Sequence, residues 1–334
     1  MPKEVRLSDI AERIGVSTVT VSKALADKQG MGEDLRAKIK ETASAMGYTP
    51  SKKKNLQKPS TGNIGILVPQ RFLYGANSFY WDMYQRLLHC LLEKTYFGLL
   101  EILSIEDEDN LVVPRMLQDK KIDGIIILGQ LDRPYREFIS SVSGEILVYL
   151  DSDEVSQGDT CIISDGYYGM YTMTKYLISM GHRDIYFVGS IDATSSILDR
   201  YYGYCRAMHE RKFPVTPDMI IPDRDEKGRM GFTLPDRLPS AFACNSDATA
   251  GYLITLLKEH NLEIPNDISV VGFDDYMLPG LSHPSITTYA VDIDKMVSTC
   301  ANIIIQKILN NNYLQNTTII NGHIVIRDSV KKIE

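Results

Sequence analysis

Cysteine and histidine side chains are the residues best able to bind metals or act as nucleophiles, and their spacing here argues against both roles. The chain has five cysteines and six histidines, scattered along its length and without a C-x-x-C pair. An odd number of widely spaced cysteines predicts neither a disulfide framework nor a zinc site. The acidic run at 106–109 follows an apolar segment and indicates a solvated turn and helix start, not a calcium site. We expect no metal and no cofactor.

Nucleotide-dependent chemistry and acyl transfer also lack a sequence signature. No G-x-G-x-x-G or P-loop string follows a strand-like run, and no Ser/His/Asp or Cys/His grouping has a recognisable form. The sequence therefore favours a binding protein over an enzyme.

The chain has 334 residues and a mass of 37.6 kDa. It is longer than one compact domain usually is, so any binding site is positioned by elements of more than one structural unit. Apolar residues make up 44% and charged residues 24%, an ordinary globular balance. The first ten residues are charged where a secretory signal requires an apolar core, and no stretch approaches the roughly 20 apolar residues that span a bilayer. We expect a folded cytoplasmic protein with no membrane partner.

Charge divides the chain into two parts. Residues 1–60 contain 12 Lys and Arg against 7 Asp and Glu, a net charge of +5, whereas the remainder contains 24 against 36, a net charge of −12. A basic head on an acidic body predicts a small module that binds a polyanion, attached to a larger part with another role.

The head has the pattern of a helix-turn-helix. Apolar residues at helical spacing predict a helix over 7–14, a glycine breaks it, and Ser17 is a suitable N-cap for a second helix over 18–25. That second helix turns four side chains outward, which are Thr18, Val19, Ser22 and Lys23. A third helix over 33–46, stopped by Gly47, completes the smallest usable core. A helical bundle without a ligand has the same pattern, so the helices alone leave that alternative open.

Short motifs follow one another along the chain in a distinctive order. The head contributes RLSDIAERIGVSTVTVSKAL at 6–25, then Gly47-Tyr48-Thr49-Pro50, a basic segment ending in Leu56, and Asn63-Ile64-Gly65-Ile66. The body contributes Asp165-Gly166, Gly181-His182-Arg183-Asp184-Ile185, Arg200 with Gly203-Tyr204, Asn245-Ser246-Asp247, Val271-Gly272-Phe273-Asp274-Asp275, Thr287-Thr288 and Arg327. In this order, which is hard to obtain by chance, they closely resemble the LacI/GalR family of bacterial transcription regulators.

The resemblance implies a role for the outward face of the second helix. In that family this helix enters the major groove, where each base pair exposes a distinct pattern of donors and acceptors. Thr18 and Val19 then fall where bases are selected, and Ser17 and Ser22 where phosphates are contacted. Lys23 stands where many members carry arginine, so its contact should discriminate less between bases.

Residues 51–58 correspond to the family's hinge helix, which folds against the minor groove when two protomers bind DNA and inserts a leucine between base pairs. Leu56 matches that leucine. The other predicted DNA contacts in this segment are Lys52, Lys53, Lys54 and Asn55. The family's usual alanine–arginine pair is Lys53-Lys54 here, so the close approach that the alanine makes in the family is not expected at this step. The alternative is that the lysines only solvate a linker.

From residue 62 onward, short apolar runs rich in β-branched residues alternate with helical stretches. The expected strands are 63–68, 99–105, 124–128, 146–150, 184–188, 240–244 and 268–273, and the expected helices are 79–95, 110–118, 165–180, 197–212, 248–260 and 295–309. This alternation predicts parallel α/β sheets, and the number of strands indicates two of them.

The resemblance implies how the chain is divided. Residues 1–50 form the DNA-binding head, 51–61 the hinge helix and linker, and 62–330 a periplasmic-binding-protein-like core of two doubly wound lobes. The N-terminal lobe comprises 62–161 and 291–321, and the C-terminal lobe comprises 162–290 and 322–330. The chain crosses between them three times, and the effector lies between them at the carboxyl ends of strands.

The resemblance also indicates which side chains contact the effector. Asp151 follows a strand, Arg200 opens a helix and Asp274 ends a strand, and Phe79 with Tyr80 stands where the family places aromatic rings. The aspartates alternatively only end strands, and the aromatic rings alternatively belong to a core. Arg200 lies off the apolar stripe of its helix, so we expect its truncation to cost little stability.

Two departures from the family pattern affect the cleft. Ser246 replaces the usual asparagine, so any contact it makes becomes a shorter hydroxyl contact. Between 220 and 241 most members insert a helix, but prolines and glycines leave little room for one here, and we expect a loop. Sugars are the commonest effectors in the family, and the 19 tyrosines of the chain suit a glycoside.

The implied partners are double-stranded operator DNA, a sugar effector and a second copy of the chain, because a palindromic operator requires two heads. No leucine heptad follows Arg327, so we expect a homodimer and no larger assembly. The function is then that of a repressor. The alternative is a sugar-binding or sugar-modifying protein whose head serves another role, and Asp151 and Asp274 are the only acid and base candidates for such an enzyme.

Overall fold

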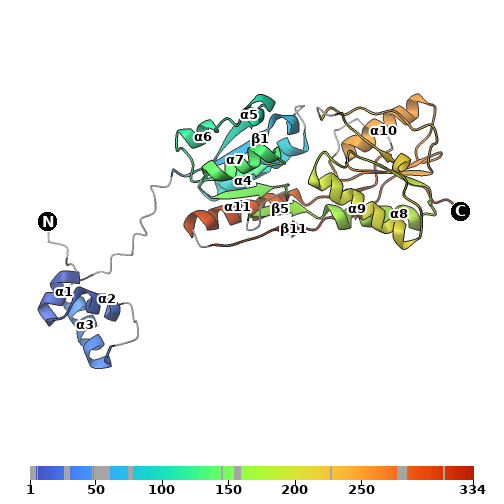
Figure 1. Ribbon diagram of the computed structural model, residues 1–334. Coiled ribbons are helices and arrows are strands. Elements are labelled where there is room, and N and C mark those ends of the chain that lie inside the picture. Colours follow the sequence, from blue (N-terminus) through green and yellow to red (C-terminus); the bar gives the residue numbers. More distant parts are fainter. Residues whose placement is uncertain are drawn as a thin grey trace. The chain divides into compact units, whose positions relative to one another are not determined.

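A computed structural model of the chain describes residues 5, 7–25, 31–46, 48, 61–73, 78–143, 146–153, 159–225, 228–276, 284–310 and 313–334. The chain divides into two compact units, Met1–Pro59 and Ser60–Glu334 (Figure 1). No helix in the described ranges combines the length and apolar character needed to cross a membrane.

The smaller unit is a three-helix head. Helix α1 spans Leu7–Ile14, α2 spans Thr18–Leu25 and α3 spans Glu33–Ala45. Apolar side chains from all three helices form its buried core, and they are Ile10, Ala11, Val21, Ala24, Ile39 and Ala43. Gly15 turns the chain from α1 to α2 at φ 75°, a left-handed conformation that glycine adopts without a side-chain clash. The predicted helix-turn-helix is confirmed.

The larger unit begins with a parallel six-stranded sheet in the order β11-β5-β4-β3-β1-β2. The strands are β1 Asn63–Pro69, β2 Phe97–Leu103, β3 Gly124–Leu128, β4 Leu147–Leu150, β5 Cys161–Ser164 and β11 Thr318–Ile320. Side chains alternate across it, so Ile126 joins one core and its neighbour Ile127 joins another. This sheet forms the N-terminal lobe.

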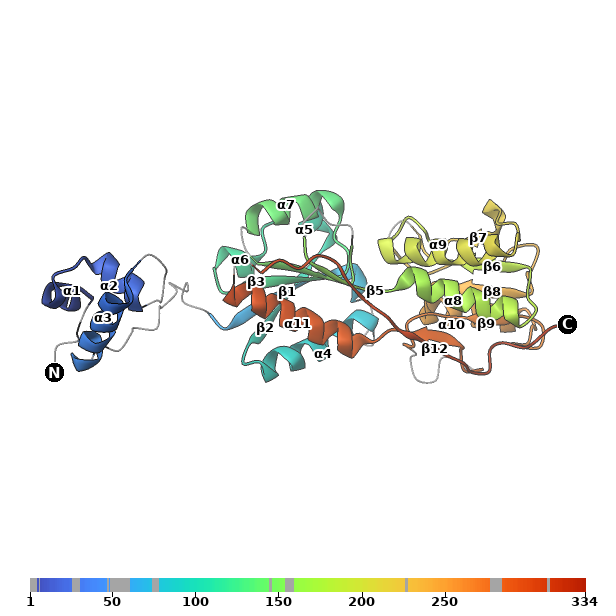
Figure 2. The ribbon, with the colours of Figure 1, turned by 90° about the horizontal axis from the view of Figure 1, so that it is seen from below.

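Helices cover both faces of this sheet. The first face packs against α4 Phe79–Glu93 and α11 Ile293–Leu309, and the second against α6 Arg115–Gln118 and α7 Arg133–Ser143. Figure 2 shows α7 on one side of the sheet and α4 with α11 on the other. The acidic run lies in a short helix, as predicted. This helix is α5 Ile105–Asp109, and Ser104 and Asp107 form a capping box at its N-terminus.

The C-terminal lobe has a parallel four-stranded sheet in the order β7-β6-β8-β9. Its strands are β6 Ile185–Val188, β7 Ile220–Ile221, β8 Ala241–Cys244 and β9 Ser269–Val271, and its helices are α8 Gly166–Ser179, α9 Ser195–Glu210 and α10 Asp247–Glu259. A separate antiparallel pair joins β10 Thr288–Ala290 to β12 His323–Val325. A helical head followed by two parallel α/β lobes is the predicted fold class, which is confirmed.

The chain passes between the lobes from β5 to α8, from β10 to α11 and from β11 to β12. Because β5 pairs with β4 and β11, the N-terminal lobe continues to Ser164, beyond the expected boundary at 161. The N–H of Ile333 donates to the Met180 carbonyl at 2.8 Å, so the packed C-terminal segment also extends beyond 330.

Candidate functional site

The exposed face of α2 is the candidate DNA-contacting surface of the head. Val21 is buried beneath it, whereas the four side chains predicted to face outward are all exposed, and they are Thr18, Val19, Ser22 and Lys23. Val19 is 61% exposed although it is apolar. An apolar side chain held in that position can contact a thymine methyl group in a major groove.

Ser17 already has a structural role at the start of α2. The N–H of Thr20 donates to Ser17 Oγ at 3.1 Å, and the two hydroxyl oxygens lie 2.8 Å apart. Ser17 is therefore the predicted N-cap, and a phosphate contact by the same hydroxyl stays a prediction. The remaining predicted contacts lie outside the described residues, as does the helix stop at Gly47, and these contacts are Lys52, Lys53, Lys54, Asn55 and Leu56.

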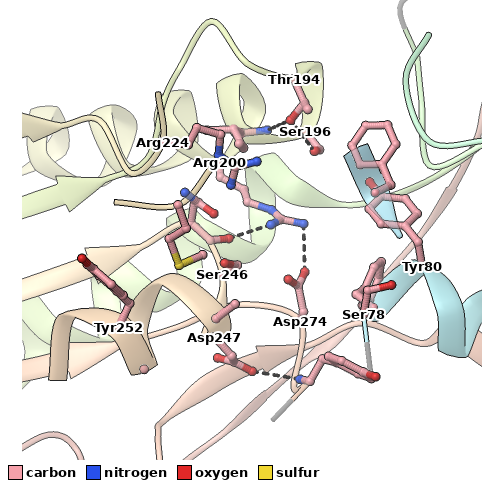
Figure 3. Close-up of a pocket in the computed structure, with 18 of the residues that line it drawn as sticks. Ser78, Tyr80, Thr194, Ser196, Arg200, Arg224, Ser246, Asp247, Tyr252 and Asp274 are labelled. Carbon is pink, nitrogen blue, oxygen red and sulfur yellow. Dashed lines mark hydrogen bonds and ion pairs between the residues drawn. The ribbon is translucent and has the colours of Figure 1, made fainter. Parts of the chain in front are cut away.

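A pocket of about 500 Å³ in the larger unit is lined by side chains from both lobes (Figure 3). All six residues predicted to contact an effector line this pocket, and they are Phe79, Tyr80, Asp151, Arg200, Ser246 and Asp274. The first three belong to the N-terminal lobe and the last three to the C-terminal lobe. The structure brings these six side chains together, and their contact with a ligand stays a prediction.

Arg200 is an interior residue, which corrects the expectation that it lies off the apolar stripe of its helix. It is only 6% exposed, on the same face of α9 as Ile197 and Tyr204. Its guanidinium donates to the Asn245 carbonyl at 2.6 Å and to Asp274 at 3.0 Å, and it lies 4.0 Å from the Phe273 ring centroid. The flat guanidinium packs on the aromatic ring as an apolar surface would. A prediction that counts only apolar residue types on the buried face of a helix therefore leaves Arg200 out.

Asp151 and Asp274 follow strands of different lobes, and both have left-handed backbones. Their φ angles are 62° and 101°, values that cost free energy in residues other than glycine. Burial raises the pKa of both carboxyl groups, although the charge of Arg200 opposes the shift at each. Strain and desolvation at two facing carboxylates are the properties expected of a binding site.

Tyr80 connects Asp151 to a group of aromatic rings. Its hydroxyl donates to Asp151 at 2.8 Å, and its ring centroid lies 4.6 Å from that of Phe72 and 5.5 Å from that of Phe79. Phe79 in turn lies 5.9 Å from Tyr276 of the other lobe. The pocket thus has an aromatic wall beside its carboxylates, an arrangement that suits a ring with polar edges and an apolar face.

Ser246 lines the pocket, but its hydroxyl is already engaged. It caps α10 by accepting from the Thr249 N–H at 3.1 Å, and it donates to Thr249 Oγ1 at 3.0 Å. Thr249 then donates to Asp223 at 2.9 Å. With its own proton committed, the Ser246 oxygen has only acceptor capacity left for a ligand.

Asp223 is the centre of this network, and the sequence analysis missed it. It is fully buried and accepts from Ser190 N–H, Asn245, Thr249 and two nitrogens of Arg224. Burial alone would raise the pKa of Asp223, but the Arg224 guanidinium and the other donors outweigh burial and hold it below its usual value. The available signal was its position just after β7, since Asp151 and Asp274 also follow strands.

The segment 222–239 contains no helix in its described residues, as expected from its prolines and glycines. It also contributes to the pocket, because Arg224 and Met230 line it. An isolated antiparallel bridge joins these two residues, and the Gly231 N–H donates to the Asp223 carbonyl at 3.0 Å. The rim that departs from the family pattern is therefore a wall of this pocket.

A direct polar contact also links the lobes. The N–H of Ser195, at the start of α9, donates to the Gln130 side-chain oxygen at 2.9 Å. Gln130 is held in turn, because Arg71 donates to its carbonyl at 2.6 Å and pairs with the buried Glu108. Within the described ranges, no three His, Cys, Asp or Glu side chains gather in a way that could hold a metal ion.

Asp199, next to Arg200 on α9, makes the free energy of unfolding depend on pH. Burial, followed by the charges of Asp153 and Asp165, raises the pKa of Asp199 to about 6, against about 3.9 in an unfolded chain. The folded state thus binds the proton more tightly, so this contribution to stability is present below pH 4 and is lost as the pH rises to 6. We expect Asp199→Asn to raise the melting temperature at pH 7 and to change it little at pH 4.

Thermal unfolding of Asp199→Asn and the unmodified chain between pH 4 and 8 checks this expectation. Asp218→Asn, at an exposed position of the same lobe, is the matched control. Parallel pH curves for the unmodified chain and Asp199→Asn would contradict the assignment.

Two family profiles match the chain. The one described as "Bacterial regulatory proteins, lacI family" matches residues 6–51, and the one described as "Periplasmic binding protein-like domain" matches residues 174–330. A curated relative, the HTH-type transcriptional repressor PurR of Vibrio campbellii, is 28% identical over 336 residues, which cover 98% of this chain and 99% of that protein.

Solved structures share the fold over nearly the whole chain. A complex of the transcriptional regulator CelR with cellobiose matches with a TM-score of 0.70 at 18% identity, covering 98% of this chain and 100% of that one. The lac repressor dimer bound to operator and the anti-inducer ONPF matches with a TM-score of 0.67 at 18% identity and the same coverage.

Proposed function

The chain belongs to the LacI family of bacterial transcriptional regulators, and we propose that it is a repressor that binds a palindromic operator as a homodimer and is switched by a sugar. Family membership makes it a DNA-binding regulator with an effector-binding core and not an enzyme. The operator symmetry, the dimer, the sugar and the residues that contact them are the proposed parts. A regulator of chromosomal genes acts in the cytoplasm, which we propose as its location.

One observation carries the effector half of the proposal. Six side chains predicted from sequence alone come from both lobes and line one pocket, which combines carboxylates and an arginine with an aromatic wall. Sugar hydroxyls form hydrogen bonds with carboxylates and arginine, and the apolar face of a sugar ring packs on aromatic side chains. Cellobiose is the ligand of the structurally similar CelR, which supports the same class of effector here.

The exposed face of α2 supports the DNA half. We propose that Thr18 and Val19 contact base edges, and that Ser17, Ser22 and Lys23 contact phosphates or base edges. In the segment 51–58, we propose that the lysines and Asn55 contact the DNA backbone while Leu56 separates base pairs. A dimer of the structurally similar lac repressor binds its operator, which supports the proposed homodimer.

Replacing Lys23 with alanine tests the DNA contact. We expect weaker binding to duplex DNA and a slope of log affinity against log salt that is smaller by about one, because one phosphate contact is lost. Fluorescence anisotropy across a salt series measures this slope on an operator selected from random duplexes. Lys38→Ala, on the exposed side of α3, is the control that should retain the original slope. An unchanged slope for Lys23→Ala would remove Lys23 from the interface.

The effector half is tested on the same operator complex. Sugars are first screened for those that raise the melting temperature, because a ligand at 100 times its dissociation constant adds roughly 2.7 kcal/mol to stability. Each stabilising sugar is then added to the operator complex. A change in DNA affinity supports the proposal, and sugars that stabilise the protein without changing its DNA affinity would refute the switch.

A further inference from the structure

The charged groups around the pocket carry an excess of carboxylates. Asp151, Asp247 and Asp274 line it and Asp223 lies behind it, whereas the cations are Arg200 and Arg224. Each guanidinium is already paired. Arg200 binds Asp274 at 3.0 Å, and Arg224 binds both oxygens of Asp223 at 3.0 and 2.7 Å. Two carboxylates therefore have no arginine partner among the described residues.

The Asp151 carboxylate and the neighbouring Ser246 hydroxyl can accept hydrogen bonds from a ligand. Within the described part of the chain, the Tyr80 hydroxyl is the one hydrogen-bond donor to the Asp151 carboxylate. The Ser246 oxygen offers only acceptor capacity, because its proton goes to Thr249. A second negative charge beside the Asp151 carboxylate would be repelled, whereas a hydroxyl can donate to it. The pocket thus favours a donor-rich, uncharged ligand over an anion.

Two helices begin at this pocket, and helix N-termini commonly attract anions. Their first N–H groups are already used here. The Ser195 N–H of α9 donates to Gln130, and the Asp247 N–H of α10 donates to the Phe273 carbonyl at 2.8 Å. The Thr249 N–H of the same first turn is also occupied, because it donates to Ser246 Oγ at 3.1 Å. These helix starts therefore do not reverse the preference against an anion.

The pocket extends beyond its carboxylates toward a less polar region. Figure 3 shows Tyr252 and Arg224 on the side of the pocket opposite Tyr80 and Ser78, with Asp274 between them. Met230, which forms an isolated bridge with Arg224, and Tyr252 both line the pocket and are 40% and 36% exposed. The Tyr252 ring is supported by Phe232, whose centroid is 5.0 Å away. Apolar surface left open beside a filled polar site can receive a second ring.

We propose that Met230, Tyr252 and Arg224 form a second subsite, so that the effector is an uncharged molecule of two linked sugar rings and not a monosaccharide or a sugar phosphate. The first ring lies among Asp151, Arg200 and Asp274, and the second lies on Met230 and Tyr252. The volume of about 500 Å³ exceeds what one sugar ring fills. This inference rests on the proposed sugar-responsive function and narrows its ligand class.

The test compares matched sugars on the full-length protein. Glucose, galactose, cellobiose, maltose, lactose, sucrose and trehalose are measured by thermal shift and calorimetry, with sucrose 6-phosphate and trehalose 6-phosphate as charged counterparts. We expect at least one neutral disaccharide to bind at least tenfold more tightly than its component monosaccharides. Where that disaccharide is sucrose or trehalose, its 6-phosphate should bind at least tenfold more weakly, because the phosphate charge meets carboxylates that have no cation partner.

A double variant, Met230→Ala with Tyr252→Ala, tests the location of the subsite. Both side chains are more than a third exposed, so their truncation should leave the fold intact. We expect about a tenfold weaker disaccharide affinity, in line with the loss of one aromatic and one apolar contact. Tyr168→Ala is the matched control, because Tyr168 is 53% exposed on α8 and does not line the pocket.

The outcomes separate this inference from the function on which it rests. Unchanged disaccharide affinity in the double variant, or tighter binding of a phosphorylated sugar than of its neutral counterpart, would overturn the second subsite and leave a sugar-responsive repressor standing. If neither neutral nor phosphorylated sugars bind at all, the sugar proposal itself fails.

Discussion

Arg200→Ala is expected to abolish the response of DNA binding to effector and to lower the free energy of unfolding by about 3–5 kcal/mol. The stability loss follows from burial. Truncation leaves the Asp274 carboxylate without its cation and the Asn245 carbonyl without its donor. This expectation replaces the one from sequence, in which a cleft-surface arginine costs little. The measurements are urea denaturation at pH 7 and operator titrations with and without a stabilising sugar.

A second variant separates the two effects of removing Arg200. The pair Arg200→Met with Asp274→Asn removes both charges, so most of the lost stability should return, because no buried charge is left unpaired. The effector response should stay absent, since neither replacement restores the hydrogen bonds that the guanidinium and the carboxylate make to a ligand. A double variant that still responds with the original midpoint would show that Arg200 and Asp274 do not anchor the effector.

Asp223→Ala is expected to lower the free energy of unfolding by a similar amount, about 3–5 kcal/mol. Five donor atoms lose their acceptor, and Arg224 is left largely buried without a counter-charge. Denaturation of the full-length chain measures the loss. Asp184→Ala is the matched control, because Asp184 pairs with the exposed Arg237, and such surface pairs contribute about 1 kcal/mol or less. Equal losses for the two variants would show that Asp223 is not the centre of a network.

Asp223 also contributes to the loss of folding stability at low pH. Because the pKa of Asp223 is lowered by folding, its contribution is present above the unfolded value near 3.9 and is lost as the pH falls below it. Asp199 acts in the opposite direction between pH 4 and 6. Asp223→Asn should therefore flatten the loss of stability below about pH 4, and unfolding titrations of that variant against the unmodified chain measure it.

Residues at regular spacing could be predicted well from sequence. The helices α1 and α2 begin and end as predicted, because their buried positions recur every three or four residues. Strand β3 also has its predicted bounds, since the uninterrupted apolar run between Gly124 and Gly129 has one reasonable placement. Helix α7 was missed because its buried Tyr135 and Ile139 stand among polar residues.

The parts of the site that sequence missed depend on contacts between distant segments. The role of Asp223 depends on hydrogen bonds from Asn245 and Thr249, and the local periodicity of a sequence cannot predict contacts between such distant residues. The burial of Arg200 was missed for a related reason. Its carbon and guanidinium surfaces pack on Phe273, which lies on a strand-end segment of the same lobe and not on its helix. Family resemblance located Arg200 and Asp274, but only the structure pairs them.

The hydrogen bond between the Ser195 N–H and Gln130 bears on how sensitive the proposed switch is. A neutral hydrogen bond contributes a net of about 0.5–1.5 kcal/mol, well below the roughly 5.5 kcal/mol of differential binding that carries a two-state equilibrium from 1:99 to 99:1. Gln130 does not line the pocket, so its side chain biases the lobes without touching a ligand. If the proposed switch is correct, we expect changes at Gln130 to move the effector concentration at half-maximal response by up to about tenfold while leaving ligand recognition as it is.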